Sequence, residues 1–129
     1  FEGGTDAVGV VARDNSGLIV CATSTGGTSN RPPGRVGDVP LPGCGFWVQD
    51  GVGVGATGIG EAITRGMISL RVADRILEGN DLEESMMWVL DECLEGGAEV
   101  GIIALGSEGT GHGVSNSTNM PWASWIARK

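Results

Sequence analysis

The sequence predicts an α+β fold built around an antiparallel sheet. Short apolar runs rich in Val, Ile and Ala open the chain, two segments with helical periodicity follow, and further apolar runs close it. Strand runs followed by helix runs are typical of α+β domains. The chain has 129 residues, of which 40% are hydrophobic, so it is long enough for one domain with a buried core.

Two β-hairpins are predicted in the first half of the chain. Residues 6–13 (DAVGVVAR) and 18–24 (LIVCATS) flank a turn sequence at 14–17 and should pair with each other. A second pair of short strands, 45–49 and 51–56, flanks the favoured hairpin turn Asp50-Gly51. The loop between the hairpins is long and rich in proline and glycine, which is usual for a functional loop.

Two helices are predicted in the second half. Apolar residues recur at helical spacing from 63 to 77, and Gly79-Asn80 marks the end of that helix. Asp81, with Glu84 three residues later, is a capping-box signal for a second helix that runs to about Leu94. The residues expected to face inward are Ile63, Met67, Leu70, Ala73 and Leu77, followed by Leu82, Met86, Val89, Leu90 and Cys93.

Further strands are predicted after the helices, over residues 100–105, 114–115 and 122–127. Within the second helix, Met86-Met87-Trp88 is a cluster of large apolar side chains. We expect this cluster to belong to the core rather than to a ligand site.

Composition argues against several classes of function. The formal net charge of −8 disfavours a nucleic-acid-binding surface, which needs clustered Lys and Arg. No run of 18 apolar residues is present, so no transmembrane helix is predicted, and no signal peptide is recognisable. We therefore expect neither nucleic acid nor membrane among the partners.

The cysteines and the histidine also limit the chemistry. Cys21, Cys44 and Cys93 are odd in number and widely spaced, so they are expected to be reduced, buried side chains in a cytoplasmic protein. His112, the only histidine, stands in the turn-like run 109–113 and is expected to be a surface turn residue. A Ser-His-Asp triad and a zinc site are therefore disfavoured, and neither metal nor cofactor is predicted.

Three glycine-rich motifs carry the functional signal: residues 23–27 (TSTGG), 34–38 (GRVGD) and 56–61 (ATGIGE). Glycines let backbone N–H groups approach a ligand closely, and Thr57-Gly58 near a helix start can face a developing oxyanion. Arg35 offers a planar fork for a carboxylate, and Asp38 can accept from an amino group. Such a pair suits an α-amino acid, although the same two side chains could simply pair to brace the loop.

In order and spacing, these motifs resemble the family of plant-type asparaginases, isoaspartyl peptidases and glycosylasparaginases. The resemblance begins at Val8-Gly9 and runs to the segment 119–123, so it covers nearly the whole chain. It implies an N-terminal-nucleophile hydrolase with an αββα sandwich, of which this chain would be the β-subunit half. In that family a precursor cuts itself before a threonine, which then attacks the substrate with its own α-amine as the base.

The resemblance places Ala7 at the nucleophile position, because the family's threonine stands immediately before a Val-Gly or Ile-Gly pair. Distances counted from Ala7 to Asp14, Gly17, Thr23, Thr25, Arg35 and Asp38 match the family without a gap. Distances counted from Thr5 do not match. Residues 1–6 would thus lie upstream of the cut, and residues 7–129 would form the β subunit.

Alanine has no hydroxyl, so neither self-cleavage nor substrate attack is expected from Ala7. An engineered Thr-to-Ala precursor would explain both Ala7 and the presence of residues 1–6. A natural inactive homologue remains the alternative. The start of the chain at Phe1 without a methionine is expected of a fragment or a processed piece.

The resemblance also implies a role for each remaining site residue. The substrate would be a β-amide of L-aspartate, and the chain would work with an N-terminal α subunit of the same precursor in an (αβ)₂ assembly. Thr25 would be a second active-site threonine, and Thr57 and Gly58 would form the oxyanion hole. Arg35 would bind the substrate's α-carboxylate, and Asp38 with the Gly60 backbone would bind its α-amino group.

Substrate preference stays open. Asn30 after the first motif, in place of a bulky basic stretch, favours asparaginase or isoaspartyl peptidase over glycosylasparaginase. Ile59 departs from the Thr or Asn often found there, which puts the fine specificity in doubt. A binding module that keeps the Arg35 and Asp38 pocket without turnover is the non-enzymatic alternative.

Overall fold

The computed structural model describes residues 7–127. The expected upstream segment 1–6, with Thr5 and Asp6, and residues 128–129 lie outside the described part. The strands are β1 (Ala7–Arg13), β2 (Ile19–Thr25), β3 (Phe46–Gln49), β4 (Val52–Gly58), β5 (Val100–Leu105) and β6 (His112–Ser115). The helices are α1 (Gly60–Gly66), α2 (Ile68–Leu77) and α3 (Leu82–Glu92).

Both sheets are antiparallel, as predicted. β1 and β2 form a two-stranded sheet, and β3, β4, β5 and β6 form a four-stranded sheet in that order. The two predicted hairpin turns are confirmed. Asp14 accepts from Ser16 N and Leu18 N at 2.8 and 3.0 Å, whereas Asp50 and Gly51 turn the chain with φ values of 46° and 81°.

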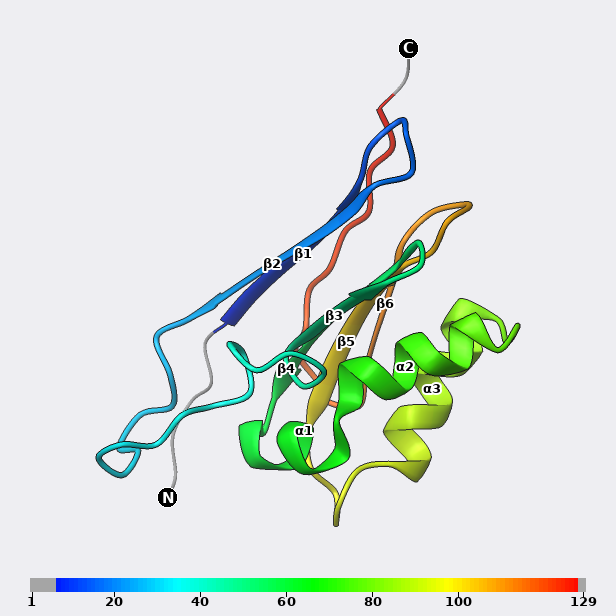
Figure 1. The fold of residues 1–129 in the computed structure, drawn as a ribbon. Helices are drawn as coiled ribbons and strands as arrows, with labels where there is room; N and C mark the ends of the chain where they lie inside the picture. The colour runs from blue at the N-terminus through cyan, green and yellow to red at the C-terminus, as the bar shows by residue number, and fades with distance from the viewer. Residues whose placement is uncertain (1–6, 128–129) are drawn as a thin grey trace.

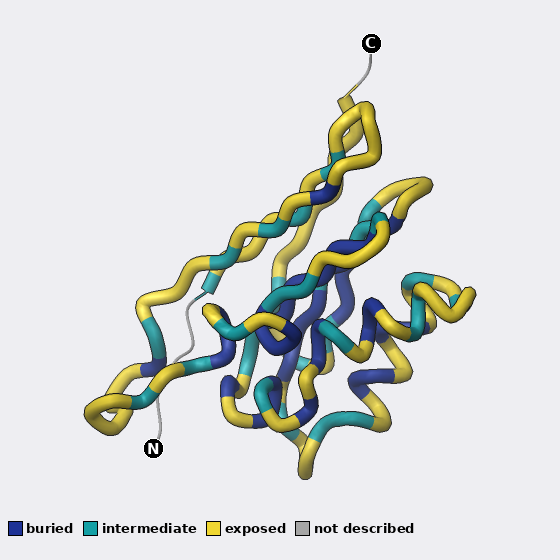
Figure 2. Tube along the Cα trace, in the orientation of Figure 1, coloured by how far each residue is buried: buried dark blue, intermediate teal, exposed yellow. Residues whose placement is uncertain are grey.

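The four-stranded sheet lies between the helices and the β1–β2 sheet, as Figure 1 shows. Alternate residues of β4 and β5 pack in one apolar core with α1, α2 and α3. This core appears as the dark-blue centre of Figure 2. Its fully buried members include Val54, Ile63, Ile68, Val72, Ala73, Met86, Val89 and Ile102.

Glycines bring the two sheets close together on the other face. A Cβ added at Gly53 would lie 2.5 Å from Val11 Cγ1 and 2.7 Å from Ile19 Cγ2. At Gly55, such an atom would meet Ile103 at 3.3 Å. Strands β1 and β2 can therefore lie directly over β4, and this places the start of β1 beside the end of β4.

The first helical segment differs from the prediction, because it is broken into α1 and α2 at Met67. Met67 adopts φ 45° and ψ 54°, and its N–H donates to the last carbonyls of α1. At Gly66, a Cβ would lie 2.7 Å from Ile68 and 2.8 Å from Cys93 O, so glycine allows the close approach. The break changes the helical phase, which leaves Met67 and Leu77 exposed rather than inward.

The second predicted helix is confirmed as α3, including its N-cap. Asp81 accepts from Glu84 N at 3.1 Å. Met86, Val89 and Leu90 are buried as expected. The expectation that Met87 and Trp88 lie in the core is wrong, because they occupy the outer face of α3 with 45% and 40% of their surface exposed.

The end of the chain also differs from the prediction. Residues 122–127 form no strand; they are exposed and irregular, and Trp122 packs by its side chain over Gly113 rather than through a backbone ladder. His112 begins β6 instead of lying in a surface turn. Its ring centroid is 4.8 Å from that of Trp122, and its Nε2 is 3.2 Å from Glu83 Oε1.

The three cysteines are free thiols, as predicted, but only Cys44 is buried; Cys21 and Cys93 are half-buried. Among the helices of residues 7–127, none is both long enough and apolar enough to cross a membrane.

Candidate active site

Ala7 and Thr25 face each other at the open end of the β1–β2 hairpin. They are paired in the strand register, and directly opposite residues in antiparallel strands hold their Cβ atoms about 5 Å apart. Thr25 Oγ1 accepts from Gly27 N at 3.0 Å, which shapes the start of the glycine-rich loop. The first predicted motif thus lies beside position 7.

Six of the seven predicted site residues line one pocket with a volume of about 220 Å³. Strand ends contribute Ala7, Thr25, Thr57 and Gly58, and the long loop contributes Arg35 and Asp38. The seventh residue, Gly60, lies directly behind the two charged side chains. A Cβ at Gly60 would be 2.5 Å from Arg35 Nη2 and 2.9 Å from Asp38 Oδ1.

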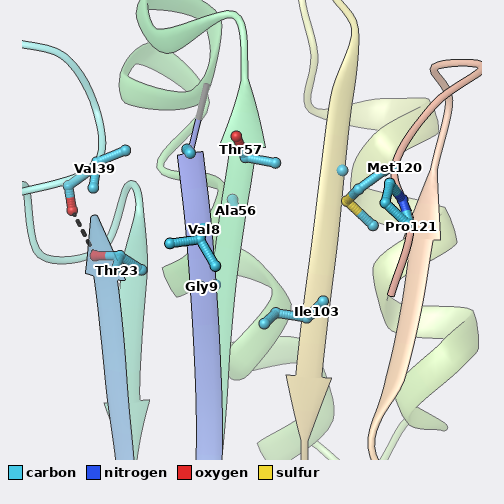
Figure 3. A pocket seen from close by; sticks show the side chains of 12 residues that line it. Val8, Gly9, Thr23, Val39, Ala56, Thr57, Ile103, Met120 and Pro121 are labelled. Carbon is cyan, nitrogen blue, oxygen red and sulfur yellow. Dashed lines mark hydrogen bonds between the residues drawn. The ribbon is translucent and has the colours of Figure 1, made fainter. Parts of the chain in front are cut away.

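A second cavity of about 140 Å³ lies between the two sheets on another side of position 7. Figure 3 shows Val8 and Gly9 of β1 facing Ala56 and Thr57 of β4 across it. The dashed line in the figure joins Thr23 Oγ1, which donates at 3.2 Å, to Val39 O. This bond ties β2 to the loop that carries Asp38.

Asp38 is a buried carboxylate, with only 5% of its surface exposed. Its Oδ2 has no hydrogen-bond partner within the described residues. Burial raises the pKa of Asp38, and the nearby Arg35 charge opposes that rise. A buried carboxylate oxygen without a partner costs free energy, so an ammonium group placed there would be bound favourably.

Arg35 forms a two-pronged ion pair with Glu61, on the first turn of α1. Its Nε is 2.8 Å from Glu61 Oε1, and its Nη2 is 3.2 Å from Oε2. The hydrogen bonds to Glu61 raise the pKa of Arg35, and those from Arg35 lower the pKa of Glu61. The interpretation in which Arg35 and Asp38 pair to brace the loop is thus corrected, because among residues 7–127 the ion-pair partner of Arg35 is Glu61 and not Asp38.

Glu61 was not among the predicted site residues, although it ends the third motif. Its negative charge and its position in the first turn of a helix could have identified it. It is an acidic residue directly after Gly60, in the first helical turn, and the loop brings an arginine to that turn.

Gly58 allows the sharp change of direction after β4. Its φ of 139° suits glycine, and an added Cβ would overlap Glu99 O and Val100 Cα. Ile59 N then donates to Glu99 O at 3.0 Å, so β5 holds the turn from its far side. The turn keeps Thr57 and Gly58 at the rim of the pocket.

Within residues 7–127, no group of three or more His, Cys, Asp or Glu side chains is placed to hold a metal ion. Three charged residues line the pocket, namely Arg31, Arg35 and Asp38, and Glu61 adds a second carboxylate through its ion pair with Arg35.

A sequence model of the family described as "Asparaginase" matches residues 2–129. The chain belongs to the asparaginase family. It is 49% identical over 82 residues to a plant-type L-asparaginase of Pyrobaculum calidifontis, an overlap that covers 63% of this chain and 27% of the relative. It is 38% identical over 120 residues to an isoaspartyl peptidase/L-asparaginase of Danio rerio, covering 90% and 38% of the two chains.

The Escherichia coli isoaspartyl peptidase is 41% identical to this asparaginase-family chain over 105 residues, covering 79% of the chain and 33% of the relative. The chain thus spans between about a quarter and two fifths of the length of these three relatives.

Proposed function

We propose that this chain belongs to an amidohydrolase that cleaves β-amide bonds of L-aspartate, as in L-asparagine and β-aspartyl dipeptides. Ala7 occupies the nucleophile position in this proposal, so the chain as written is inactive. The proposal rests on one observation above all. The Arg35 guanidinium and the buried Asp38 carboxylate share a pocket with position 7 and two strand-end threonines.

Substrate recognition follows from the two charges. Arg35 would bind the α-carboxylate. Asp38 Oδ2, which has no hydrogen-bond partner among the described residues, would accept a hydrogen bond from the α-ammonium group. Gly60 has no side chain to occupy the space between them. The β-amide would then extend from this end of the pocket towards position 7.

Catalysis would require a threonine at position 7. Its hydroxyl would attack the β-carbonyl while its own α-amine takes the proton, and Thr57 with Gly58 would stabilise the oxyanion. Thr25, opposite position 7 in the register, would orient the nucleophile. The proton passes to the leaving amine, the C–N bond breaks, and water then hydrolyses the acyl-threonine ester.

Maturation is part of the same proposal. The precursor would cut itself between residues 6 and 7, which makes residues 7–129 the β subunit. An N-terminal α subunit would complete the αββα sandwich and an (αβ)₂ assembly in the cytoplasm. Ala7 would be an engineered replacement that stops the precursor before this cut, and a natural inactive homologue is the alternative.

The test is an assay of the Ala7→Thr variant, co-produced with the proposed α segment, against L-asparagine, β-aspartyl-leucine and glycosylated asparagine. We expect release of ammonia or leucine from the first two, and none from the unchanged Ala7 protein. Hydrolysis of glycosylated asparagine alone would support a glycosylasparaginase instead. L-aspartate binding by calorimetry without hydrolysis of any substrate would support the amino-acid-binding homologue.

A further inference from the structure

The geometry points to Glu61 as a positioning residue that holds the Arg35 guanidinium in the orientation needed to bind the substrate α-carboxylate. This inference rests on the proposed function of the pocket. Glu61 would act through Arg35 and would not touch the substrate itself.

The ion pair between Glu61 and Arg35 uses one defined edge of the guanidinium. Glu61 Oε1 and Oε2 accept from Nε and Nη2, at 2.8 and 3.2 Å. Two parallel bonds to one carboxylate fix both the position and the plane of the fork, which a single contact would not do. Nη1 takes no part in these two bonds to Glu61.

Two glycines enclose the same guanidinium. A Cβ at Gly37 would lie 2.7 Å from Arg35 Nη1, and one at Gly60 would lie 2.5 Å from Nη2. The Arg35 side chain is 12% exposed, whereas that of Glu61 is 47% exposed. Glu61 therefore holds the arginine from the solvent side, and the Nη1 side lies at Gly37, which lines the pocket.

The position of Glu61 in the chain also favours a role in orienting Arg35. Glu61 follows Gly60 directly, and Gly60 touches the space of both Arg35 and Asp38. One short segment, 57–61, thus supplies the pocket rim, the glycine that lets both charged side chains approach the backbone, and the carboxylate that pairs with the arginine. The ion pair of Arg75 with Glu84, at 2.7 Å, has similar exposure, and neither residue lines the pocket, so this pair serves as the comparison.

The test uses the Ala7→Thr protein with its α segment, in which Glu61 is changed to Ala or Gln. We expect Glu61→Ala to raise KM for L-asparagine roughly 10- to 100-fold, because a charge-assisted pair that orients the binding group is lost. Glu61→Gln keeps one acceptor oxygen and should recover part of this loss. Glu84→Gln, which removes the charge partner of Arg75 outside the pocket, should leave KM unchanged.

A substrate without the α-carboxylate separates positioning from general damage. For 3-aminopropanamide, which keeps the amine and the amide, Glu61→Ala should change kcat/KM by less than about twofold. The double variant Arg35→Ala/Glu61→Ala should be no worse on L-asparagine than Arg35→Ala alone, because both changes remove one function.

The results distinguish failure of this inference from failure of the proposed function. An active Ala7→Thr protein with the same KM after Glu61→Ala would overturn the role of Glu61 alone. Equal losses of kcat/KM on L-asparagine and 3-aminopropanamide would show that Glu61 has only a structural role, and would also overturn the inference. An Ala7→Thr protein inactive on every β-aspartyl substrate would overturn the proposed function and this inference with it.

Discussion

At the scale of single residues, the pocket depends on unlike charges placed in unlike environments. Arg35 is held by the partly exposed Glu61, whereas Asp38 is buried with one oxygen unpartnered among the described residues. The ion pair with Arg35 thus favours the ionised form of Glu61, whereas burial disfavours the ionised form of Asp38. This contrast is what an amino-acid pocket needs, because the ligand's ammonium group supplies the missing partner.

The raised pKa of Asp38 predicts a specific dependence of stability on pH. Between its usual value of 3.8 and its raised value, the folded protein holds more protons than the unfolded chain, so this group lowers stability as pH rises. In the Asp38→Asn variant, this decrease of stability with rising pH should be absent. The difference in unfolding free energy between Asp38→Asn and the parent should therefore grow from acid to neutral pH, as measured by urea titration, at several pH values, of proteins co-produced with the α segment. A difference that does not change with pH would contradict the burial of an ionised group.

The same residue predicts how ligand binding responds to acid. Only the carboxylate form of Asp38 attracts an ammonium group, so L-asparagine should bind more weakly as pH falls through the raised pKa. KM of the Ala7→Thr protein should rise in this range above 3.8, before the substrate's own groups lose charge. A KM that stays constant down to that value would argue against contact between Asp38 and the amine.

At the scale of elements, the sequence predicted both hairpins, β5 and α3 correctly because their signals are local, whereas the strand predicted over 122–127 is absent. Asp14 and Asp50 mark the turns, and Asp81 caps α3 through its own side chain. The break at Met67 escaped prediction because a left-handed methionine has no propensity signal; tertiary contacts of α2 stabilise it. Leu70 N donates to Gly43 O at 2.9 Å, and Ser69 Oγ donates to Cys44 O at 2.7 Å.

For the candidate site, too, only the features with a local sequence signal could be predicted. Glycine-rich motifs indicated three segments that could approach a ligand; six of the seven predicted residues line one pocket, and Gly60 lies next to Arg35 and Asp38. The pairing of Arg35 with Glu61 is a contact across 26 positions, and no local pattern reports it. Burial of Asp38 is likewise a property of the packed loop and not of its sequence.

Gly58 tests how strongly the turn after β4 depends on its backbone. Gly58→Ala should destabilise the protein by about 2 kcal/mol or more, because an alanine at φ 139° is strained and its Cβ overlaps Glu99 O. Gly26→Ala is the matched control, since a Cβ there meets nothing within 4 Å. Equal unfolding free energies for both variants in urea titration would show that the turn relaxes freely.

At the scale of the whole molecule, the outer face of the β1–β2 sheet is apolar and uncovered by the described residues. Val8, Val10, Leu18 and Val20 are between 56% and 65% exposed. Figure 2 shows this hairpin largely in the colour of exposed residues, in contrast to the buried four-stranded sheet. Such a face is a docking surface or an aggregation hazard, and the proposed α subunit would cover it.

We therefore expect residues 1–129 produced alone to aggregate, and co-production with the α segment to keep them soluble. Val10→Thr/Val20→Thr keeps β-branched residues but lowers apolarity, so it should reduce aggregation of the isolated chain. Light scattering and size-exclusion chromatography measure both effects. An isolated chain that is soluble, monomeric and unfolds cooperatively would show that this face needs no cover.

The central claim is that position 7 is the nucleophile position, and intact-mass analysis of the Ala7→Thr precursor tests it most directly. The account predicts that the single chain separates into two, with the cut between residues 6 and 7, while the Ala7 protein stays whole under the same conditions. An Ala7→Thr chain that remains intact, or that is cut before Thr5 instead, would contradict it.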